Sequence, residues 1–399
     1  MHPTRRRLIA SAATIPLIGV AGRASAAKDP VRVGIPTPLT GTYGDVGNQA
    51  KRAVEFAVNE ANAAGGVDGR EVQVRFLDTE AKPDLARQQA EKLALTGHNL
   101  LAATQTSAES LAIAPMLMRW NALYICTIAK ANAITGASCS PRAFRVNHPD
   151  ASDAATVLPW LKTRTETKWA IMSADYAWGH SAGGSFRKAA ESIGKTIVSE
   201  NYAPLGASDY APYIQRIKDS GAAGMWVALS GGDAINFGRQ AHQFGLLDHI
   251  VTAGVSFTTD NTVKAMGDFS KGIWAIVNYS STLDTPANKA FVAAWARRYP
   301  GSAPTNFEGE TYVGMQVLFQ AVSKAGSVAP ADLAKAMPGM MFDTVYGRNL
   351  MRPEDHQLVV PNYFGRVGER DGVLKPVIEM VVPPDQAVPP PDGSCKLTS

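Results

Sequence analysis

Residues 31–78 read VRVGIPTPLTGTYGDVGNQAKRAVEFAVNEANAAGGVDGREVQVRFLD, and this stretch decides the fold. Alternating apolar residues predict one strand over 31–35 and a second over 72–76. Between them, apolar residues recur three and four positions apart over 50–61, which predicts a helix with one buried face. A Gly-Gly pair and an Asp-Gly turn end the helix and return the chain. The stretch therefore predicts two parallel strands flanking one helix, a right-handed βαβ unit.

The loop after the first of these strands is a candidate pocket wall. Pro36 and Pro38 cannot donate hydrogen bonds to a strand ladder, so the strand ends there. In open parallel sheets, ligands bind beyond the carboxyl ends of the strands. We therefore expect residues 40–47 to face a ligand.

Strand and helix patterns continue to alternate as far as residue 253, which predicts an α/β protein with doubly wound parallel sheets. The number of strands exceeds one sheet of ordinary width, so we expect two lobes. Residues 286–326 are mostly helical in pattern, and 358–367 and 374–382 alternate like two antiparallel strands.

Residues 1–26 have the features of a secretory signal peptide. Three arginines precede an apolar run, and Ala24-Ser25-Ala26 supplies an A-x-A cleavage site. The paired arginines fit a twin-arginine signal as well as an ordinary secretion signal. Because the apolar run is shorter than the ~20 residues that span a bilayer, we expect cleavage near Ala26 and export to the periplasm.

The formal net charge of +4 comes from this signal segment, which contains Arg5, Arg6, Arg7 and Arg23 and no acidic residue. Without the segment the net charge falls to about zero, which argues against nucleic acid or an anionic membrane as a partner. The content of 45% apolar and 19% charged residues is typical of a globular protein, and the length suffices for two cores.

Three cysteines in an exported chain predict one disulfide and one spare thiol. Cys126 lies in the apolar run LYICT, where a buried thiol is common. Cys139 and Cys395 lie in loop-like sequence, and their pairing would attach the C-terminal tail, although spacing alone does not fix connectivity. There is no CxxC or mixed Cys/His cluster, and the seven histidines are scattered, so we expect no metal.

Common motifs of enzymes are absent: the sequence lacks G-x-x-x-x-G-K-[ST], H-E-x-x-H and G-x-S-x-G. Gly41, Gly44 and Gly47, together with Asp78, suggest a dinucleotide site, but these glycines are spaced three apart where the fingerprint needs two and then three. We therefore expect no enzyme and no cofactor. An exported NAD-type enzyme remains a remote alternative.

Several segments together resemble the periplasmic solute-binding proteins of branched-chain amino-acid (Leu/Ile/Val-binding-like) ABC transporters. They follow in the same order over nearly all of the mature chain. These segments are PLTG (38–41), VNEANAAGGVDGR (58–70), SAESLAIAP (107–115), AFRVN (143–147), DYAWG (175–179), GGDAINFGRQAHQFGL (231–246) and DHQ (355–357).

The resemblance implies a type I periplasmic binding protein: two doubly wound parallel-sheet lobes joined by a three-segment hinge. Lobe 1 would comprise 27–146 with a return through 277–343, and lobe 2 would comprise 147–276 with a return through 344–382. Residues 383–399 would form a Pro-rich C-terminal tail. A small solute would bind between the lobes, which close around it. The receptor, expected to be a monomer, would deliver the solute to the transmembrane subunits of an ABC permease.

The resemblance also assigns ligand-binding residues. Ser107 begins a helix and matches the serine that holds the substrate carboxylate in the family, although a plain N-cap role is the alternative. Trp178 takes the place of a cleft tyrosine and would stack on an apolar or aromatic ligand, unless it belongs to the core. Tyr43 would wall the cleft or stand exposed in its loop, and Ser230 ends a strand. The full set of expected ligand-binding residues is Tyr43, Ser107, Ile128, Ala129, Lys130, Asp150, Trp178 and Ser230.

Two departures from the family pattern predict the class of ligand. In amino-acid binders of the family, a threonine and a glutamate meet the ammonium, but here Lys130 replaces the threonine and Ala253-Gly254 supplies no acid. Burying an ammonium without a carboxylate costs several kcal/mol. We therefore favour an anion without an α-ammonium, such as an aromatic carboxylate, with Ser107 and Lys130 on the anion and Trp178 on the body.

Three alternatives stay open at this point. Lys130 would instead be a rim residue paired with Asp150 or another acid. The receptor would bind an amino acid, an amide or a urea. A ligand sensor of the same fold is the third, although such sensors work in the cytoplasm and the signal segment predicts export.

Overall fold

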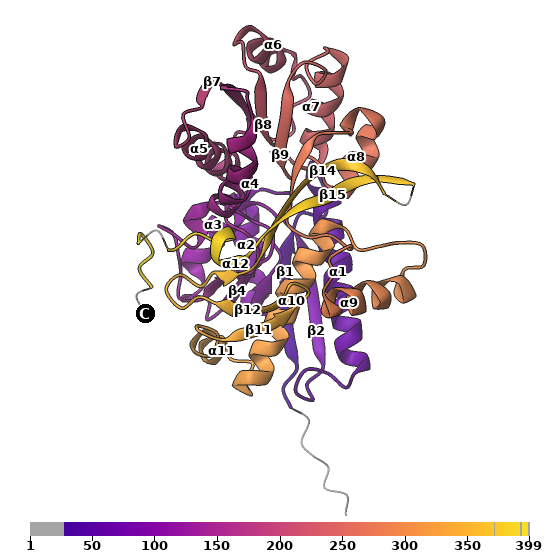
Figure 1. The fold of residues 1–399 in the computed structure, drawn as a ribbon. Coiled ribbons are helices and arrows are strands. Elements are labelled where there is room, and N and C mark those ends of the chain that lie inside the picture. The colour runs from indigo at the N-terminus through magenta and orange to yellow at the C-terminus, as the bar shows by residue number, and fades with distance from the viewer. Residues whose placement is uncertain (1–27, 371, 392, 398–399) are drawn as a thin grey trace, which may run out of the picture.

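The computed structural model describes residues 28–370, 372–391 and 393–397, so the expected signal peptide lies outside the described residues. The chain forms two lobes, one above the other in Figure 1, and the strands β14 and β15 cross between them. Among the described residues, none of the helices is both long and apolar enough to cross a bilayer.

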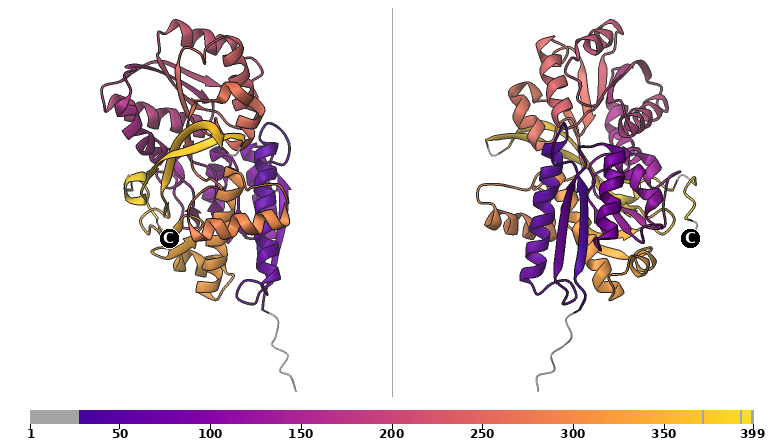
Figure 2. Two further views of the ribbon diagram at one scale, coloured as in Figure 1. Left: turned by 45° about the vertical axis from the view of Figure 1, so that its right-hand side comes forward. Right: turned by 180° about the vertical axis from the view of Figure 1, so that it is seen from behind.

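The first sheet contains five parallel strands in the order β2-β1-β3-β4-β5. Val31, Val33 and Ile35 of β1 are fully buried, as their alternation predicts. The βαβ unit expected over 31–78 is confirmed, and β1, β2 and α1 run side by side in the view from behind (Figure 2). The elements of this part are β1 (Val31–Thr37), α1 (Gly44–Ala63), β2 (Val72–Asp78), α2 (Pro83–Leu95), β3 (Leu100–Ala102), α3 (Ser107–Ile113), the 3-10 turns η1 (Ala114–Met116) and η2 (Asn132–Ile134), β4 (Leu123–Cys126) and β5 (Ala143–Arg145).

The second sheet has the order β15-β14-β10-β9-β8-β6-β7. The strands β10, β9, β8, β6 and β7 are parallel to one another. At one edge β14 pairs antiparallel with β10 and with β15. The elements here are α4 (Asp150–Thr163), β6 (Lys168–Ala174), α5 (Ala177–Glu191), β7 (Thr196–Ala203), α6 (Ala211–Asp219), β8 (Gly224–Ala228), α7 (Gly231–Gln243), β9 (Val251–Val255), α8 (Asp260–Met266), η3 (Gly267–Ser270), β10 (Trp274–Val277), β14 (Asn362–Arg370) and β15 (Val373–Val382).

The segment between β10 and β14 packs on the first sheet. Tyr312 of α10 lies against Phe56 of α1 with ring centroids 5.7 Å apart, and a small antiparallel sheet follows. The apolar residues Met351 and Leu358 of that sheet share one core with Val31. The elements are α9 (Pro286–Arg298), α10 (Asn306–Ala325), α11 (Pro330–Ala336), β11 (Met341–Thr344), β12 (Gly347–Met351) and β13 (Leu358–Val359).

This packing bears on the expected lobe boundaries, which remain a prediction. The alternating pattern over 358–367 predicted one strand, but Pro361 separates β13 from β14. Because the residues up to β13 pack with the first sheet, the third crossing between lobes would lie near Pro361 rather than at 344. The other two crossings would lie before α4 and after β10.

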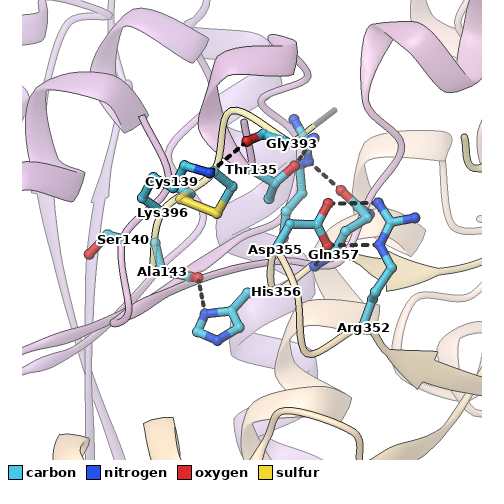
Figure 3. The surroundings of a disulfide bond; sticks show 12 residues. Thr135, Cys139, Ser140, Ala143, Arg352, Asp355, His356, Gln357, Gly393 and Lys396 are labelled. Carbon is cyan, nitrogen blue, oxygen red and sulfur yellow. Dashed lines mark hydrogen bonds and ion pairs between the residues drawn. A yellow bond between two sulfur atoms is a disulfide. The ribbon is translucent and has the colours of Figure 1, made fainter. Parts of the chain in front are cut away.

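The C-terminal tail, with the short helix α12 (Pro384–Ala387), is attached to the body by contacts that include a disulfide and a hydrogen bond. Cys139 and Cys395 form a disulfide with their Cα atoms 5.5 Å apart (Figure 3). Arg352, drawn in the same view, donates from Nη1 to the carbonyl of Pro389 at 2.7 Å. The remaining cysteine, Cys126 in β4, is buried and free.

Candidate ligand-binding site

A pocket lies where both lobes meet, and its walls come from segments that follow strands or begin helices in each of them. The lobes lie close together here, and the cavity volume left between them is about 20 Å³. The lining residues are Tyr43, Val46, Gln105, Ser107, Ile128, Ala129, Lys130, Tyr176, Trp178, Ser230, Ser256 and Phe307.

Seven of the eight residues expected from the sequence line this one pocket. The eighth, Asp150, lies behind the wall, where it accepts a hydrogen bond from Nε1 of Trp178 at 3.1 Å. Sequence reasoning missed Tyr176, Gln105 and Ser256, although the first lies in the quoted motif DYAWG and the other two follow strands. Phe307 stands at the start of α10, a helix with no pattern that indicates a cleft.

Aromatic rings form the wall between the lobes. Tyr43 precedes α1 and Tyr176 precedes α5, and their hydroxyl oxygens lie 3.1 Å apart within hydrogen-bonding distance. The Tyr176 ring also lies near Trp178, with centroids 6.0 Å apart. Tyr43 is only 2% exposed, so it is not a solvated loop tyrosine. Burial raises the pKa of both phenols, so both remain protonated and able to donate.

Ser107 is fixed by the backbone that faces it. The N-cap of α3 is Thr106, which forms a capping box with Glu109, so Ser107 is the first residue of the helix and not its cap. The Oγ of Ser107 accepts hydrogen bonds from the backbone N–H groups of Lys130 at 3.2 Å and Ala131 at 3.0 Å. Within the described chain we find no acceptor for the hydroxyl hydrogen, which therefore stays available to a ligand oxygen.

Lys130 lines the pocket, but its ammonium already has partners. Its Nζ lies 3.0 Å from Oδ2 of Asp153 and donates to Oδ1 of Asn278 at 2.9 Å. Glu310 also faces this ammonium, but burial raises the pKa of its carboxyl group to about 8, so that group is mostly neutral at pH 7. Asp153 is therefore the counterion. The contact between Nζ and a ligand anion stays a prediction, and the acid that pairs with the ammonium in this structure is Asp153.

Asp153 connects the crossings between the lobes. Besides the ion pair, its Oδ1 accepts hydrogen bonds from Nδ2 of Asn278 at 3.1 Å and from Nδ2 of Asn362 at 3.0 Å. Asp153 lies in α4, Asn278 follows β10, and Asn362 begins β14. One buried carboxylate therefore joins the three segments in which we expect the lobes to connect.

The site is suited to binding rather than to chemistry on the ligand. The polar side-chain groups of the lining are hydroxyls, one amide, the paired lysine and the indole N–H of Trp178, which donates to Asp150. In the described parts of the chain, no group of three or more His, Cys, Asp or Glu residues is placed to hold a metal ion.

Residues 30–372 match the family model described as periplasmic binding protein. The chain belongs to this family. A curated relative, Leu/Ile/Val-binding protein homolog 6 of Brucella melitensis, is 26% identical over 355 residues, which cover 87% of this chain and 90% of the relative.

Two solved structures of ABC transporter binding proteins share the periplasmic binding fold and superpose well. The solute-binding protein of an ABC transporter from Rhodopseudomonas palustris BisB5, in complex with 3,4-dihydroxybenzoic acid, is 27% identical, with a TM-score of 0.82 and coverage of 89% of this chain and 98% of that chain. An ABC transporter substrate-binding protein from Sphaerobacter thermophilus is also 27% identical, with a TM-score of 0.81 and coverage of 90% and 99%.

These comparisons confirm the predicted family and fold class. The family members and structural neighbours are binding proteins of ABC transporters, so this periplasmic binding protein is a substrate-binding protein and not an enzyme. Membership in the family implies export to the periplasm, whereas the expected cleavage near Ala26 concerns residues outside those described.

Proposed function

We propose that this substrate-binding protein captures an aromatic carboxylate that lacks an α-ammonium group and delivers it to the transmembrane subunits of an ABC permease. The protein would act as a monomer whose lobes close over the cargo by hinge motion at the three crossings. The observation that carries the proposal is the lining of the pocket, which combines aromatic side chains with hydroxyl donors and contains no acid.

The aromatic part of the lining suits a flat ring. Tyr43, Tyr176, Trp178 and Phe307 face the same space from both lobes. Such side chains bind aromatic ligands through offset or edge-to-face contacts that add about 0.5–1.5 kcal/mol beyond the burial of apolar area. Apolar walls with few polar groups are typical of small-molecule sites.

The polar part of the lining suits a carboxylate. Ser107 has a free hydroxyl hydrogen, and in the hydrogen-bonded pair of Tyr43 and Tyr176 one phenol hydrogen remains for a ligand. Hydrogen bonds to an ionised group contribute about 1.5–3 kcal/mol each. An α-ammonium would find no counterion, because none of the described lining residues is Asp or Glu and the charge of Lys130 is repulsive or neutralised.

Similarity supports the same class of cargo. The 27% identical neighbour from Rhodopseudomonas palustris BisB5 was solved with 3,4-dihydroxybenzoic acid. A second candidate, a receptor for branched-chain amino acids, is favoured by the names of the curated relatives at 26% identity. The composition of the pocket favours the first.

Isothermal titration calorimetry with benzoate, hydroxybenzoates, leucine, valine, acetamide and urea tests the proposal. We expect an aromatic carboxylate to bind and the other solutes to give no heat. The variant Ser107→Ala should weaken carboxylate binding by about 10- to 100-fold, the equivalent of one hydrogen bond to a charged group. Ser192→Ala, which changes an exposed serine on α5's C-terminal end, is the matched control and should bind like the unmodified protein. Micromolar binding of leucine with the aromatic acids inert would contradict the proposal.

A further inference from the structure

One side-chain atom of the pocket lacks a partner. Gln105 follows β3 and lines the pocket, and the residue is 5% exposed. Its Oε1 is buried, and the part of the chain that the structure describes offers it no hydrogen bond. An amide oxygen that is buried without a donor destabilises the ligand-free pocket, so a ligand group that donates to it is favoured.

The direction of the amide is fixed by its other end. Nε2 of Gln105 donates to the backbone carbonyl of Ala103 at 2.8 Å and to Oγ1 of Thr37 at 3.1 Å. A carbonyl oxygen can only accept, so the nitrogen must face Ala103 and the amide cannot be turned over. The unpartnered atom is therefore an acceptor, and a ligand group that pairs with it must be a hydrogen-bond donor.

We infer that Oε1 of Gln105 accepts a hydrogen bond from a hydroxyl group on the ring of the cargo, so that the preferred cargo is a hydroxylated aromatic carboxylate. The inference rests on the proposed function and deepens it. A neutral hydroxyl matches the neutral amide oxygen, whereas a charged ammonium would enter a lining that holds no acid among its described residues. The hydroxyl of Ser107, which lines the same pocket, can donate to the ligand carboxylate, whereas Oε1 of Gln105 can accept from the ring hydroxyl.

The test is calorimetry with ligands that differ only in their donor. We would titrate benzoate, 3- and 4-hydroxybenzoate, 3,4-dihydroxybenzoate and the methoxy ethers of the two monohydroxy acids, which keep the oxygen but lose the hydrogen. At least one hydroxylated acid should bind about 10- to 100-fold more tightly than benzoate and than its own ether. In Gln105→Met, which has similar length and no acceptor of that strength, this preference, measured as the ratio of the affinities for the hydroxylated acid and for benzoate, should fall by about tenfold or more.

A second variant separates recognition from packing, because Gln105→Met also removes the hydrogen bonds of Nε2. Thr37→Val removes one partner of Nε2 and leaves Oε1 in place. We expect Thr37→Val to keep the preference for the hydroxylated acid, and thermal melting of both variants to report whether each is folded.

The outcomes are distinguishable. If benzoate binds and the hydroxylated acids bind no better, or if Gln105→Met weakens benzoate and the hydroxylated acids equally, this inference is overturned and the proposed function stands. If no aromatic carboxylate binds to the unmodified protein, both are overturned.

Discussion

Replacing Lys130 by methionine tests whether its ammonium belongs to the lobe junction or to the cargo. The pair of Lys130 and Asp153 is buried, with 5% and 2% of the side chains exposed and 3.0 Å between Nζ and Oδ2. Lys130→Met keeps most of the apolar stem that lines the pocket and removes the charge. Asp153 would keep the hydrogen bonds from the amide groups of Asn278 and Asn362.

The expected loss in the free energy of unfolding depends on which of the two charges is left without its partner. Breaking a buried ion pair by removing one partner costs about 3–5 kcal/mol. We expect Lys130→Met to lower the free energy of unfolding by about 3 kcal/mol, because two amide groups still donate hydrogen bonds to the carboxylate. Asp153→Leu should lower the free energy of unfolding by about 5 kcal/mol, because the ammonium would keep the neutral acceptor Oδ1 of Asn278 and the mostly neutral Glu310. The double variant should lose clearly less than the sum, since two apolar side chains leave no unpaired charge.

The assay combines urea unfolding of the three variants with calorimetry of the best aromatic carboxylate. We expect Lys130→Met to lower the free energy of unfolding and to change the affinity by less than about tenfold. The reasoning would be refuted by a variant whose stability is within about 1 kcal/mol of the parent while its affinity for the anion falls a hundredfold or more. That result would restore the role that the sequence predicted for this lysine.

Three further predictions concern stability. Burial raises the pKa of the Glu310 carboxyl group from an ordinary 4.5 to about 8 in the folded state, so its contribution to stability is complete below pH 4.5 and is lost as the pH rises through 8. In urea unfolding, the free energy of unfolding of Glu310→Gln should therefore increase relative to that of the parent between pH 5 and 8.5. The double variant Cys139→Ser/Cys395→Ser should lose about 2–4 kcal/mol in the same assay, and peptide mapping without reductant should recover the two cysteines as one linked peptide. A Cβ on Gly47 would lie 1.6 Å from the carbonyl oxygen of Pro38, so Gly47→Ala should lower the melting temperature, whereas Gly184→Ala, with no atom within 4 Å in the middle of α5, should raise it slightly.

The sequence was most informative where local pattern and global fold agree. The alternation of Val31, Val33 and Ile35 predicted a strand because side chains two positions apart share one face, and all three are fully buried. The rule that ligands bind beyond the carboxyl ends of strands also located Ser230 and the loop that contains Tyr43, since that rule depends only on strand order.

The electrostatics of the site could not be predicted in the same way. The partner of Lys130 depends on where α4 and the crossing after β10 are packed, and Asp153 is separated from it by 23 positions that carry no pattern. Oε1 of Gln105 is left without a partner because Nε2 of the same amide donates to Thr37, 68 residues earlier in the sequence. Periodicity reports which face of an element is buried, but it does not report which polar atoms meet across two lobes.

The central claim, that the cargo carries a carboxylate and no α-ammonium, is tested most directly by a pair of ligands that differ in that group alone. L-tyrosine and 3-(4-hydroxyphenyl)propanoate share ring, chain and carboxylate, and calorimetry on the full mature protein compares them. The account predicts that the propanoate binds at least about 100-fold more tightly, since the ammonium would be buried without a counterion. Equal or tighter binding of L-tyrosine would contradict it.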